Sequence, residues 1–379
     1  MTAPIVAVVG GGQLARMMTG PATELGITLR VLVESADAAA ALGAHEAIVG
    51  LPSDADAVAR LLDGAAVVTW EHEHIPAAVF EAAEEAGVPA LPSAWALTHA
   101  QDKIAMRTRL DVLGVPNPRW SRVATSADVE HFLSGGDGAG VLKLSRGGYD
   151  GKGVRVISAA AEAEDWLAAA ATGGPAVLIE EKVPFTRELS AQVARRPSGQ
   201  MVAYPIVEST QRDGVCAEVV APAPDLAPWV ATEITALAMT IATKLDVVGM
   251  LAVELFQVGD RVLVNELAMR PHNSGHWSMD GAVTGQFEQH LRAVLDLPLG
   301  STDAVAPWTA MVNVLGGSRT DLATALADVD DADAKIHLYG KDVRAGRKVG
   351  HVTISGHDVE DVLHRARNAA DIVRDGGAP

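Results

Sequence analysis

The chain has 379 residues, 49% of them apolar, with a formal net charge of −18 and a single cysteine, Cys216. This length and composition predict two or three globular domains and exclude an intrinsically disordered chain. The negative charge argues against a nucleic-acid or membrane surface, because it repels anionic polymers and lipids. One cysteine excludes a disulfide framework and, with no signal-peptide or transmembrane pattern, predicts a reducing, cytoplasmic location.

The first part of the chain, residues 1–97, alternates between strand and helix patterns. A glycine turn, GGGQLARMM, opens a helix directly after the first apolar strand. The predicted elements are strands at 4–9, 28–34 and 65–71 and a helix at 76–86. Such alternation predicts a doubly wound parallel sheet at the start of a chain that mixes α/β and α+β organisation.

Two features of this part could bind a ligand. The spacing Gly10-x-Gly12-x-x-Ala15, with Glu34 closing the second strand, superficially fits a dinucleotide-binding fingerprint, and a tight turn explains it at least as well. The segment WEHEH (70–74) follows the third strand, at the sheet edge where open α/β sheets bind ligands. A zinc site there is a poor alternative, because no third spaced ligand accompanies it.

A smaller, glycine-rich unit is predicted over residues 98–185. Its predicted elements are helices at 98–113, 126–133 and 160–171 and the strands GVLKLS, VRVIS and AVLIEEKV. The loop RGGYDGKG (146–153) suits a phosphate-binding flap, and an ordinary hairpin loop is the alternative. Lys143 stands in an otherwise apolar strand just before this loop, which favours the phosphate site. For Glu180 and Glu181, residue type alone favours a solvated strand end over an adenine contact.

The third unit, predicted over residues 186–300, holds the most informative segment, a hairpin that carries Glu254 and Glu266 in apolar strands. If the turn near Gly259-Asp260 holds an odd number of residues, the two glutamates share a sheet face, and with an even number they do not. Two neighbouring buried carboxylates need a cation, and oxygen ligands beside phosphates predict Mg²⁺. Two solvent-facing glutamates on an exposed sheet are the alternative.

The last unit, predicted over residues 301–379, is small and reads as short strands with a terminal helix. A stretch of eight residues in this unit contains four cations, Lys341, Arg344, Arg347 and Lys348. A solvated loop is the usual meaning of such a run. In so acidic a chain, however, the cluster also suits a phosphate group.

Taken in chain order, these motifs resemble those of the ATP-grasp superfamily, and most closely the 5-(carboxyamino)imidazole ribonucleotide synthases of purine biosynthesis. GGGQLARM, GGYDGKG, NELAMRPHNSGHW and GRKVGH follow the family's order over essentially the whole chain, and HNSGHW and GRKVGH are the most specific. The resemblance implies an ATP-grasp fold and an ATP- and Mg²⁺-dependent ligase. Such an enzyme carboxylates 5-aminoimidazole ribonucleotide with bicarbonate through carboxyphosphate. The resemblance also implies a homodimer whose product passes to a separate mutase.

The resemblance assigns roles to individual residues. Arg270, His272 and Asn273 would flank bicarbonate and carboxyphosphate, and Glu254 and Glu266 would bind Mg²⁺. The implied ATP contacts are Lys103, Lys143, Gly148, Tyr149, Asp150, Gly151, Lys152, Gly153, Glu180, Glu181, Lys182, Val183, Glu188, Gln211, Asn265 and Glu266. The implied ribonucleotide contacts are Glu71, Glu73, Tyr149, Asp150, Lys152, Lys341, Arg347 and Lys348.

Two positions depart from the family pattern. Ala268 stands where many ATP-grasp enzymes have a metal-binding asparagine, and Asn265 is expected on the opposite strand face. A second metal ion would therefore rely more on phosphates than on the protein. Met269 replaces the usual proline before the arginine, and Pro271 follows it, which could alter the backbone path to His272.

Three other functions are weaker explanations of the sequence. A formate-dependent glycinamide ribonucleotide transformylase, or another carboxylate–amine ligase, does not account for HNSGHW and GRKVGH. An NAD-dependent oxidoreductase leaves the flap, the hairpin glutamates and the basic cluster unexplained. A catalytically inactive nucleotide-binding regulator is disfavoured by the intact lysines and glutamates.

Overall fold

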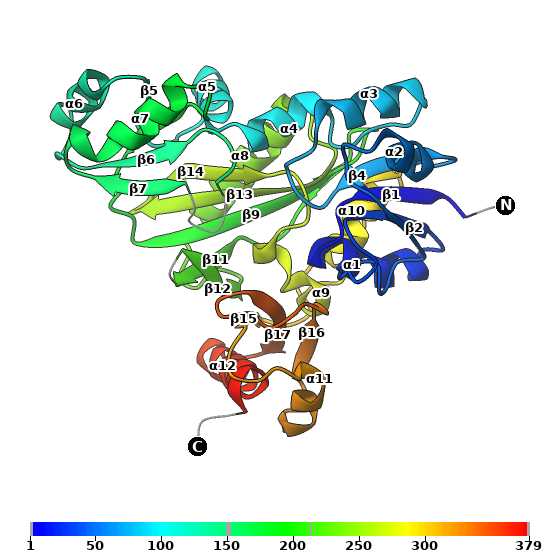
Figure 1. Ribbon diagram of the computed structural model, residues 1–379. Coiled ribbons are helices and arrows are strands. Elements are labelled where there is room, and N and C mark those ends of the chain that lie inside the picture. The colour runs from blue at the N-terminus through cyan, green and yellow to red at the C-terminus, as the bar shows by residue number, and fades with distance from the viewer. Residues whose placement is uncertain (1–2, 149–152, 213, 377–379) are drawn as a thin grey trace.

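The computed structural model describes residues 3–148, 153–212 and 214–376, and its strands form three sheets. Figure 1 shows the N-terminal sheet at the right, the central sheet at the upper left, and the third sheet between and below them. This mixed α/β arrangement confirms the predicted fold class. No helix in the described ranges is long and apolar enough to cross a membrane.

The N-terminal sheet has the strand order β3-β2-β1-β4, and all its pairs are parallel, as the doubly wound pattern predicts. Its strands are β1 (Ile5–Val9), β2 (Thr28–Val33), β3 (Glu46–Val49) and β4 (Val67–Trp70). The accompanying helices are α1 (Gln13–Glu24), α2 (Ala55–Leu62) and α3 (Ala77–Glu85). Strand β3 carries no apolar pattern because it is a largely exposed edge strand, which explains why the sequence does not predict it.

Helix α10 (Gln286–Val294) lies far along the chain but packs against this N-terminal region. Its Phe287 and Leu291 share a buried apolar cluster with Leu14 and Met18 of α1. The first residue of α10 is therefore held between the N-terminal sheet and the segment that follows the glutamate hairpin.

The central sheet has the order β5-β8-β6-β7 with antiparallel pairing throughout. Its strands are β5 (Trp120–Val123), β6 (Gly140–Leu144), β7 (Val154–Ile157) and β8 (Val177–Glu181). Helices α6 (Ser126–Ser134) and α7 (Glu164–Ala171) pack on one face, with Phe132 and Leu167 in the shared apolar cluster (Figure 1). The other face carries Lys143 of β6 and Glu180 of β8.

The single helix predicted at 98–113 is in fact two helices, α4 (Ala94–Gln101) and α5 (Lys103–Val112). Asp102 separates them because its side chain accepts hydrogen bonds from the backbone N–H groups of Ile104 and Ala105, which caps α5. An N-cap residue needs extended backbone, and Asp102 has φ −129°. The break places Lys103 at the very start of α5.

The third sheet holds nine strands in the order β14-β13-β9-β11-β12-β15-β17-β16, with β10 paired to β9. These strands are β9 (Arg187–Arg195), β10 (Met201–Ala203), β11 (Val207–Arg212), β12 (Val215–Ala221), β13 (Gly249–Val258), β14 (Arg261–Ala268), β15 (Trp308–Leu315), β16 (Lys335–Leu338) and β17 (Lys348–Gly356). The helices after β12 are α8 (Pro228–Lys244), α9 (Ser278–Gly281), α10, α11 (Leu322–Ala325) and α12 (Val359–Asp375). Strands on both sides of residue 300 therefore lie in one sheet, and the division at 97, 185 and 300 stays a prediction.

Strands β9 and β13 present different chemistry on their two faces. Leu189 and Val253 belong to the main apolar core, which includes residues of α8. The alternate positions carry Glu188, Ser190 and Glu254, and Glu254 is paired directly with Ser190. Because directly paired residues in an antiparallel ladder share a face, these polar side chains lie together on the face away from the core.

Candidate active site

Glu254 and Glu266 lie directly opposite each other on β13 and β14. The turn between the strands, Gly259-Asp260, has two residues, and with this even number the glutamates would not share a face in a regular ladder. A β-bulge after Glu254 shifts the register by one residue, so that Asn265 is the extra residue and Glu266 becomes the partner. The carboxylates meet, but through a bulge that the sequence pattern does not reveal.

The bulge also corrects the prediction for Asn265, because regular alternation puts this residue on the opposite face. Its side-chain oxygen accepts a hydrogen bond from Lys143 Nζ at 3.2 Å. Asn265 therefore points toward Lys143 of the central sheet. The strand is irregular there, and simple alternation does not apply at a bulge.

Burial raises the pKa of Glu254 to about 8, and the negative charges of Glu266 and Glu188 add to the effect. Burial likewise raises the pKa of Glu188 to about 7, against the opposing charge of Lys143. Three carboxyl groups thus crowd one face of the sheet with too little positive charge to keep them all ionised. A bound cation would supply that charge.

The residue set fits a divalent cation such as Mg²⁺. The two opposed carboxylates provide oxygen ligands, and Lys103 Nζ lies 3.0 Å from Glu266 Oε1. Within the described ranges no cluster of three or more His, Cys, Asp or Glu side chains could hold a metal, so further ligands would come from a bound phosphate chain. Ala268 is buried and has no side-chain oxygen to offer.

Glu180 is buried between two cations. Its carboxylate lies 2.8 Å from Lys143 Nζ and 2.8 Å from Arg107 Nε, and all three side chains are largely removed from solvent. Arg107 also donates to the carbonyl oxygens of Val264 and Asn265, which ties α5 to the bulge. The side chain of Glu180 therefore fixes the position of Lys143. Only the backbone of Glu180 is left for the predicted adenine contact.

Arg107 is a residue that the sequence reasoning missed. One signal was available, because Arg107 lies four residues after Lys103 in the same helix and therefore shares its face. These two cations of α5 point at the glutamate hairpin, Lys103 to the carboxylate of Glu266 and Arg107 to the backbone at Val264 and Asn265.

The other predicted ATP contacts lie at the end of β8, directly after it, and on β11. Glu181 closes β8 and accepts the backbone N–H of Arg119, and Val183 is buried in the connection to β9. Lys182 lies between them and is exposed. Gln211 lies on β11 opposite Cys216, at a register shift.

Only the two ends of the predicted flap belong to the described part of the chain. Gly148 precedes the gap, and Gly153 follows it with φ +72°, a left-handed conformation that suits glycine. The backbone N–H of Leu144 donates to Gly153 O at 3.0 Å, which closes the base of the loop. Tyr149, Asp150, Gly151 and Lys152 lie outside the described residues.

His272 follows β14 and points at the opposed carboxylates of Glu254 and Glu266. Its Nε2 lies 3.1 Å from Glu254 Oε1. Its Nδ1 accepts the backbone N–H of Ser274 and lies 2.8 Å from the Ser274 hydroxyl. Burial, together with Arg270 and Lys348, holds the pKa of His272 well below its usual range. The ring is therefore neutral, with its hydrogen on Nε2 and directed at the carboxylate.

Asn273 faces the C-terminal strands. It exchanges two hydrogen bonds with Asn313 of β15, at 3.0 and 2.7 Å, and Asn313 also donates to the carbonyl of Cys216. This reciprocal amide pair anchors the loop that carries His272 to the C-terminal strands.

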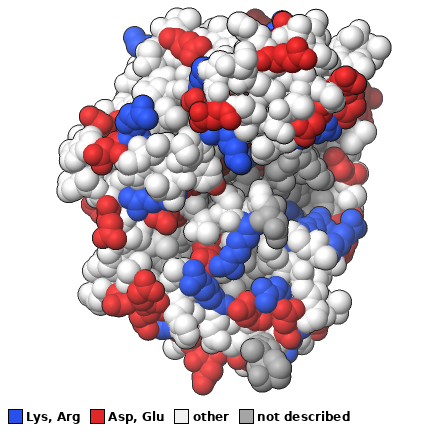
Figure 2. Space-filling view, turned by 90° about the vertical axis from the view of Figure 1, so that its left-hand side faces the viewer, with Lys and Arg blue, Asp and Glu red and all other residues white. Residues whose placement is uncertain are grey.

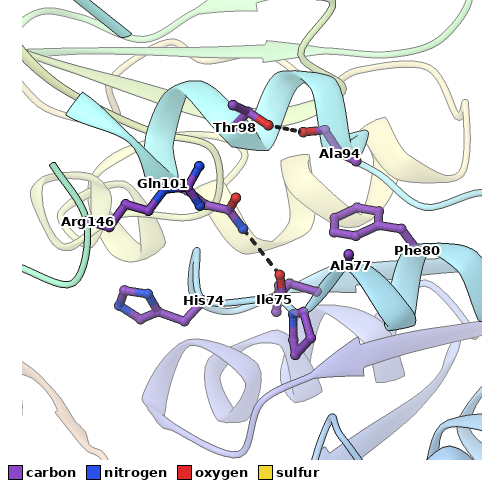
Figure 3. A pocket seen from close by; sticks show the side chains of 9 residues that line it. His74, Ile75, Ala77, Phe80, Ala94, Thr98, Gln101 and Arg146 are labelled. Carbon is purple, nitrogen blue, oxygen red and sulfur yellow. Dashed lines mark hydrogen bonds between the residues drawn. The ribbon is translucent and has the colours of Figure 1, made fainter. Parts of the chain in front are cut away.

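Arg270 and Glu73 join two regions that are far apart in sequence, with Arg270 Nε 2.8 Å from Glu73 Oε1. The Glu73 loop is held from α4, because the Gln101 amide donates to the carbonyls of Glu73 and Ile75. Figure 3 shows Gln101 and Arg146 beside a pocket of about 500 Å³, with the Gln101–Ile75 hydrogen bond dashed. The loop after β4 thus reaches the segment after β14.

Glu71 occupies the helix N-terminus that the glycine turn creates. Its carboxylate accepts the backbone N–H groups of Gly12 and Ala15 at the start of α1. A Cβ atom at Gly10 or Gly12 would overlap this side chain, so the glycines make room for Glu71. A protein carboxylate therefore takes the position that a pyrophosphate would need, which argues against a dinucleotide site.

Three of the four residues of the basic cluster line one pocket of about 410 Å³, together with Glu71 and the glycine turn. Lys341, Arg344 and Arg347 approach from the C-terminal strands, and Lys341 Nζ donates to Gln13 of α1 at 2.5 Å. Lys348 does not line this pocket, and its charge acts on Glu254 and His272 instead. Figure 2 shows Lys and Arg side chains bordering a hollow on one face of this acidic molecule.

The raised pKa of Glu254 predicts how stability changes with pH. The carboxyl group of Glu254 has a pKa of about 8 in the folded state and about 4.3 in the unfolded state, so it favours folding most at pH values below about 4.3. This contribution is lost as the pH rises from about 4.3 to about 8. The Tm of the metal-free protein should therefore fall more steeply between about pH 5 and 8 than the Tm of Glu254→Gln. Scanning fluorimetry measures both, with exposed Glu233→Gln on α8 as control. Parallel curves would contradict the assignment.

Three domain families match the chain. The ribonucleotide synthetase preATP-grasp domain matches residues 3–101, the ATP-grasp domain matches 108–287, and the phosphoribosylaminoimidazole carboxylase C-terminal domain matches 309–365. GGGQLARM lies in the first of these ranges, GGYDGKG and NELAMRPHNSGHW lie in the second, and GRKVGH lies in the third.

Whole-length relatives agree with these matches. The chain is 50% identical over 378 residues to the N5-carboxyaminoimidazole ribonucleotide synthase of Mycobacterium tuberculosis, covering 97% of this chain and 87% of that protein. The crystal structure of the Thermus thermophilus synthetase is 39% identical with a TM-score of 0.85, covering 98% of both chains. That of the Aspergillus clavatus enzyme, in complex with ADP and 5-aminoimidazole ribonucleotide, is 28% identical with a TM-score of 0.87, covering 98% and 99%. This chain therefore belongs to the ATP-grasp superfamily and, within it, to the N5-carboxyaminoimidazole ribonucleotide synthase family.

Proposed function

We propose that the chain carboxylates 5-aminoimidazole ribonucleotide with bicarbonate and ATP, giving the N-carboxyamino ribonucleotide, ADP and phosphate. The observation that carries the proposal is the Arg270–Glu73 ion pair at 2.8 Å. It brings the segment after the carboxylate hairpin up to the loop after β4, whose Glu71 lines the basic pocket. A phosphate-activating site and an acceptor site are thus neighbours, as transfer of a short-lived intermediate requires.

The first step is attack of a bicarbonate oxygen on the γ-phosphorus of ATP, which forms carboxyphosphate and releases ADP. Lys103 and Lys143 lie where they can neutralise the phosphate chain, and Glu180 holds Lys143 in place. Glu254 and Glu266 would hold Mg²⁺, which supplies charge stabilisation on the transferring phosphoryl oxygens. Arg270 and the neutral His272 would contact bicarbonate and carboxyphosphate, with Asn273 anchoring the same loop.

The second step joins the carboxyl carbon to the amine of the ribonucleotide, with loss of phosphate and of one amine proton. Glu71 lines the pocket proposed for the ribonucleotide, and Glu73 follows on the same loop, paired with Arg270. Lys341 and Arg347 would hold the 5′-phosphate in the pocket they line. The family resemblance implies that Tyr149, Asp150 and Lys152 also contact this substrate.

Replacing Arg347 with alanine should raise KM for the ribonucleotide by about 10-fold or more, because a hydrogen bond between charged groups contributes roughly 1.5–3 kcal/mol. The KM for ATP should stay within about 2-fold, since Arg347 lines the pocket proposed for the ribonucleotide. Steady-state ADP release measures both constants. Arg122→Ala, an exposed change on β5, is the control. An equal rise in both KM values would contradict the assignment.

The reaction itself is tested by ADP release with two acceptor pairs. We expect turnover with 5-aminoimidazole ribonucleotide plus bicarbonate and none with glycinamide ribonucleotide plus formate. Turnover only with the second pair would establish the transformylase alternative instead.

The finer expectations rest on the family resemblance. We propose that the enzyme is a homodimer and that a separate mutase takes its product. A cytoplasmic location rests on the single cysteine.

A further inference from the structure

Gln286, the first residue of α10, is fully buried beside the loop that carries His272. Its amide oxygen accepts the backbone N–H of His272 at 2.9 Å. Its amide nitrogen donates to the backbone carbonyl of His272 at 2.9 Å and to His276 Nδ1 at 2.8 Å. One side chain thus satisfies both backbone groups of His272 and uses both amide hydrogens.

This arrangement has only one workable orientation. A flipped amide would face its NH₂ group toward the His272 N–H and its oxygen toward the His272 carbonyl, so both hydrogen bonds would be lost. Gly275 permits the close approach, because a Cβ atom there would overlap the Gln286 amide oxygen. The backbone N–H of Gln286 also donates to Ser278 Oγ, so the backbone of Gln286 is fixed as well as its side chain. The contact of the Gln286 amide with the two backbone groups of His272 is called the clamp below.

The clamp holds His272, whose orientation determines its contact with Glu254. His272 directs its Nε2–H at Glu254 over a distance of 3.1 Å, and Ser274 fixes the ring from its other nitrogen. The Ser274 hydroxyl is held in turn by Gln192 Nε2 at 2.9 Å. Ring and backbone are therefore held separately, the ring through Ser274 and the backbone through Gln286.

We propose that Gln286 is a positioning residue for the carboxylation: it fixes the His272 backbone so that the imidazole meets bicarbonate at the carboxylate pair. This inference rests on the proposed function. Gln286 touches no reacting atom and acts only through His272 and its neighbour His276. It is held rigidly itself, because the next residue of α10, Phe287, is packed in the apolar cluster with α1.

Helix α10 provides a matched control in Gln289. This glutamine is also fully buried, and its amide makes the same two-point contact with backbone. Its nitrogen donates to Gly300 O at 2.9 Å and its oxygen accepts the Gly300 N–H at 2.8 Å. Gly300 lies in the connection between α10 and β15, and none of the proposed site residues contacts Gln289 through this amide.

The test compares Gln286→Met with Gln289→Met, each of which removes one clamp while keeping a side chain of similar size. We expect Gln286→Met to raise KM for bicarbonate and lower kcat, with kcat/KM for bicarbonate down by about 10–100-fold, as for residues that orient functional side chains. The KM for the ribonucleotide should stay within about 2-fold. Gln289→Met should lose a similar amount of Tm but keep kcat/KM within about 2-fold.

Equal kinetic losses in the two variants would overturn the proposal, because a general loss of folded enzyme lowers kcat without changing KM. If Gln286→Met does not fold, Gln286→Asn keeps a buried amide but is one methylene shorter, so it cannot reach both backbone groups of His272. The same rise in bicarbonate KM is expected, and an unchanged KM would overturn the proposal. An inactive wild-type protein overturns the proposed function, whereas an active wild type with equal variants overturns only this inference.

Discussion

Glu266→Gln is expected to lower turnover by about 10³-fold or more while leaving the fold intact, since preorganised charge at a phosphoryl-transfer site contributes on this scale. Glu266 faces Glu254 across the hairpin and pairs with Lys103 at 3.0 Å. Glutamine keeps the size of the side chain but removes the negative charge that a divalent cation needs. The change also weakens the hold on Lys103.

The measurement is ADP release at saturating ATP over a range of Mg²⁺ concentrations, with Tm as the check on folding. Glu233→Gln, an exposed change on α8, should behave as wild type. Wild-type rates for Glu266→Gln at every Mg²⁺ concentration would show that the hairpin does not hold the metal.

Glu180→Ala is expected to lower the free energy of unfolding by about 3–5 kcal/mol, because removing one partner of a buried ion pair leaves an uncompensated charge. Here two cations, Arg107 and Lys143, would lose their shared carboxylate. Urea unfolding followed by tryptophan fluorescence measures the change. The KM for ATP should also rise, because Lys143, a proposed phosphate contact, would lose the carboxylate that holds it in place.

An exposed ion pair provides the comparison for Glu180. Glu46→Ala removes the partner of Arg30, and the Glu46 side chain is 46% exposed, so the expected change is below about 1 kcal/mol. Similar losses of stability in the two variants would contradict the role of Glu180 as a buried anchor.

Periodicity predicted most of the regular structure. The apolar strands of the N-terminal part form the parallel sheet, because fully buried strands give continuous apolar runs. The hairpin with Glu254 and Glu266 forms as expected, yet the two carboxylates share a face through a bulge and not through the turn length. A bulge depends on tertiary contacts such as those of Arg107 with the Asn265 carbonyl, which no local pattern contains.

The sequence did not predict the contacts between segments that are distant along the chain. The glycine turn looks like a phosphate loop, but Glu71, 59 positions away from Gly12, fills it. The clamp of Gln286 on His272 likewise depends on how α10 packs. Short motifs report the residue types of a site, whereas ion pairs and amide clamps need the fold to bring their partners together.

The central claim is that ATP cleavage drives a carboxyl group from bicarbonate onto the ribonucleotide amine. The most direct measurement follows ¹³C-labelled bicarbonate by NMR during turnover with ATP and 5-aminoimidazole ribonucleotide, with ADP quantified in parallel. We predict a carbamate carbon on the ribonucleotide in step with ADP. ADP release with all label remaining as bicarbonate and CO₂ from the earliest time points would contradict the claim.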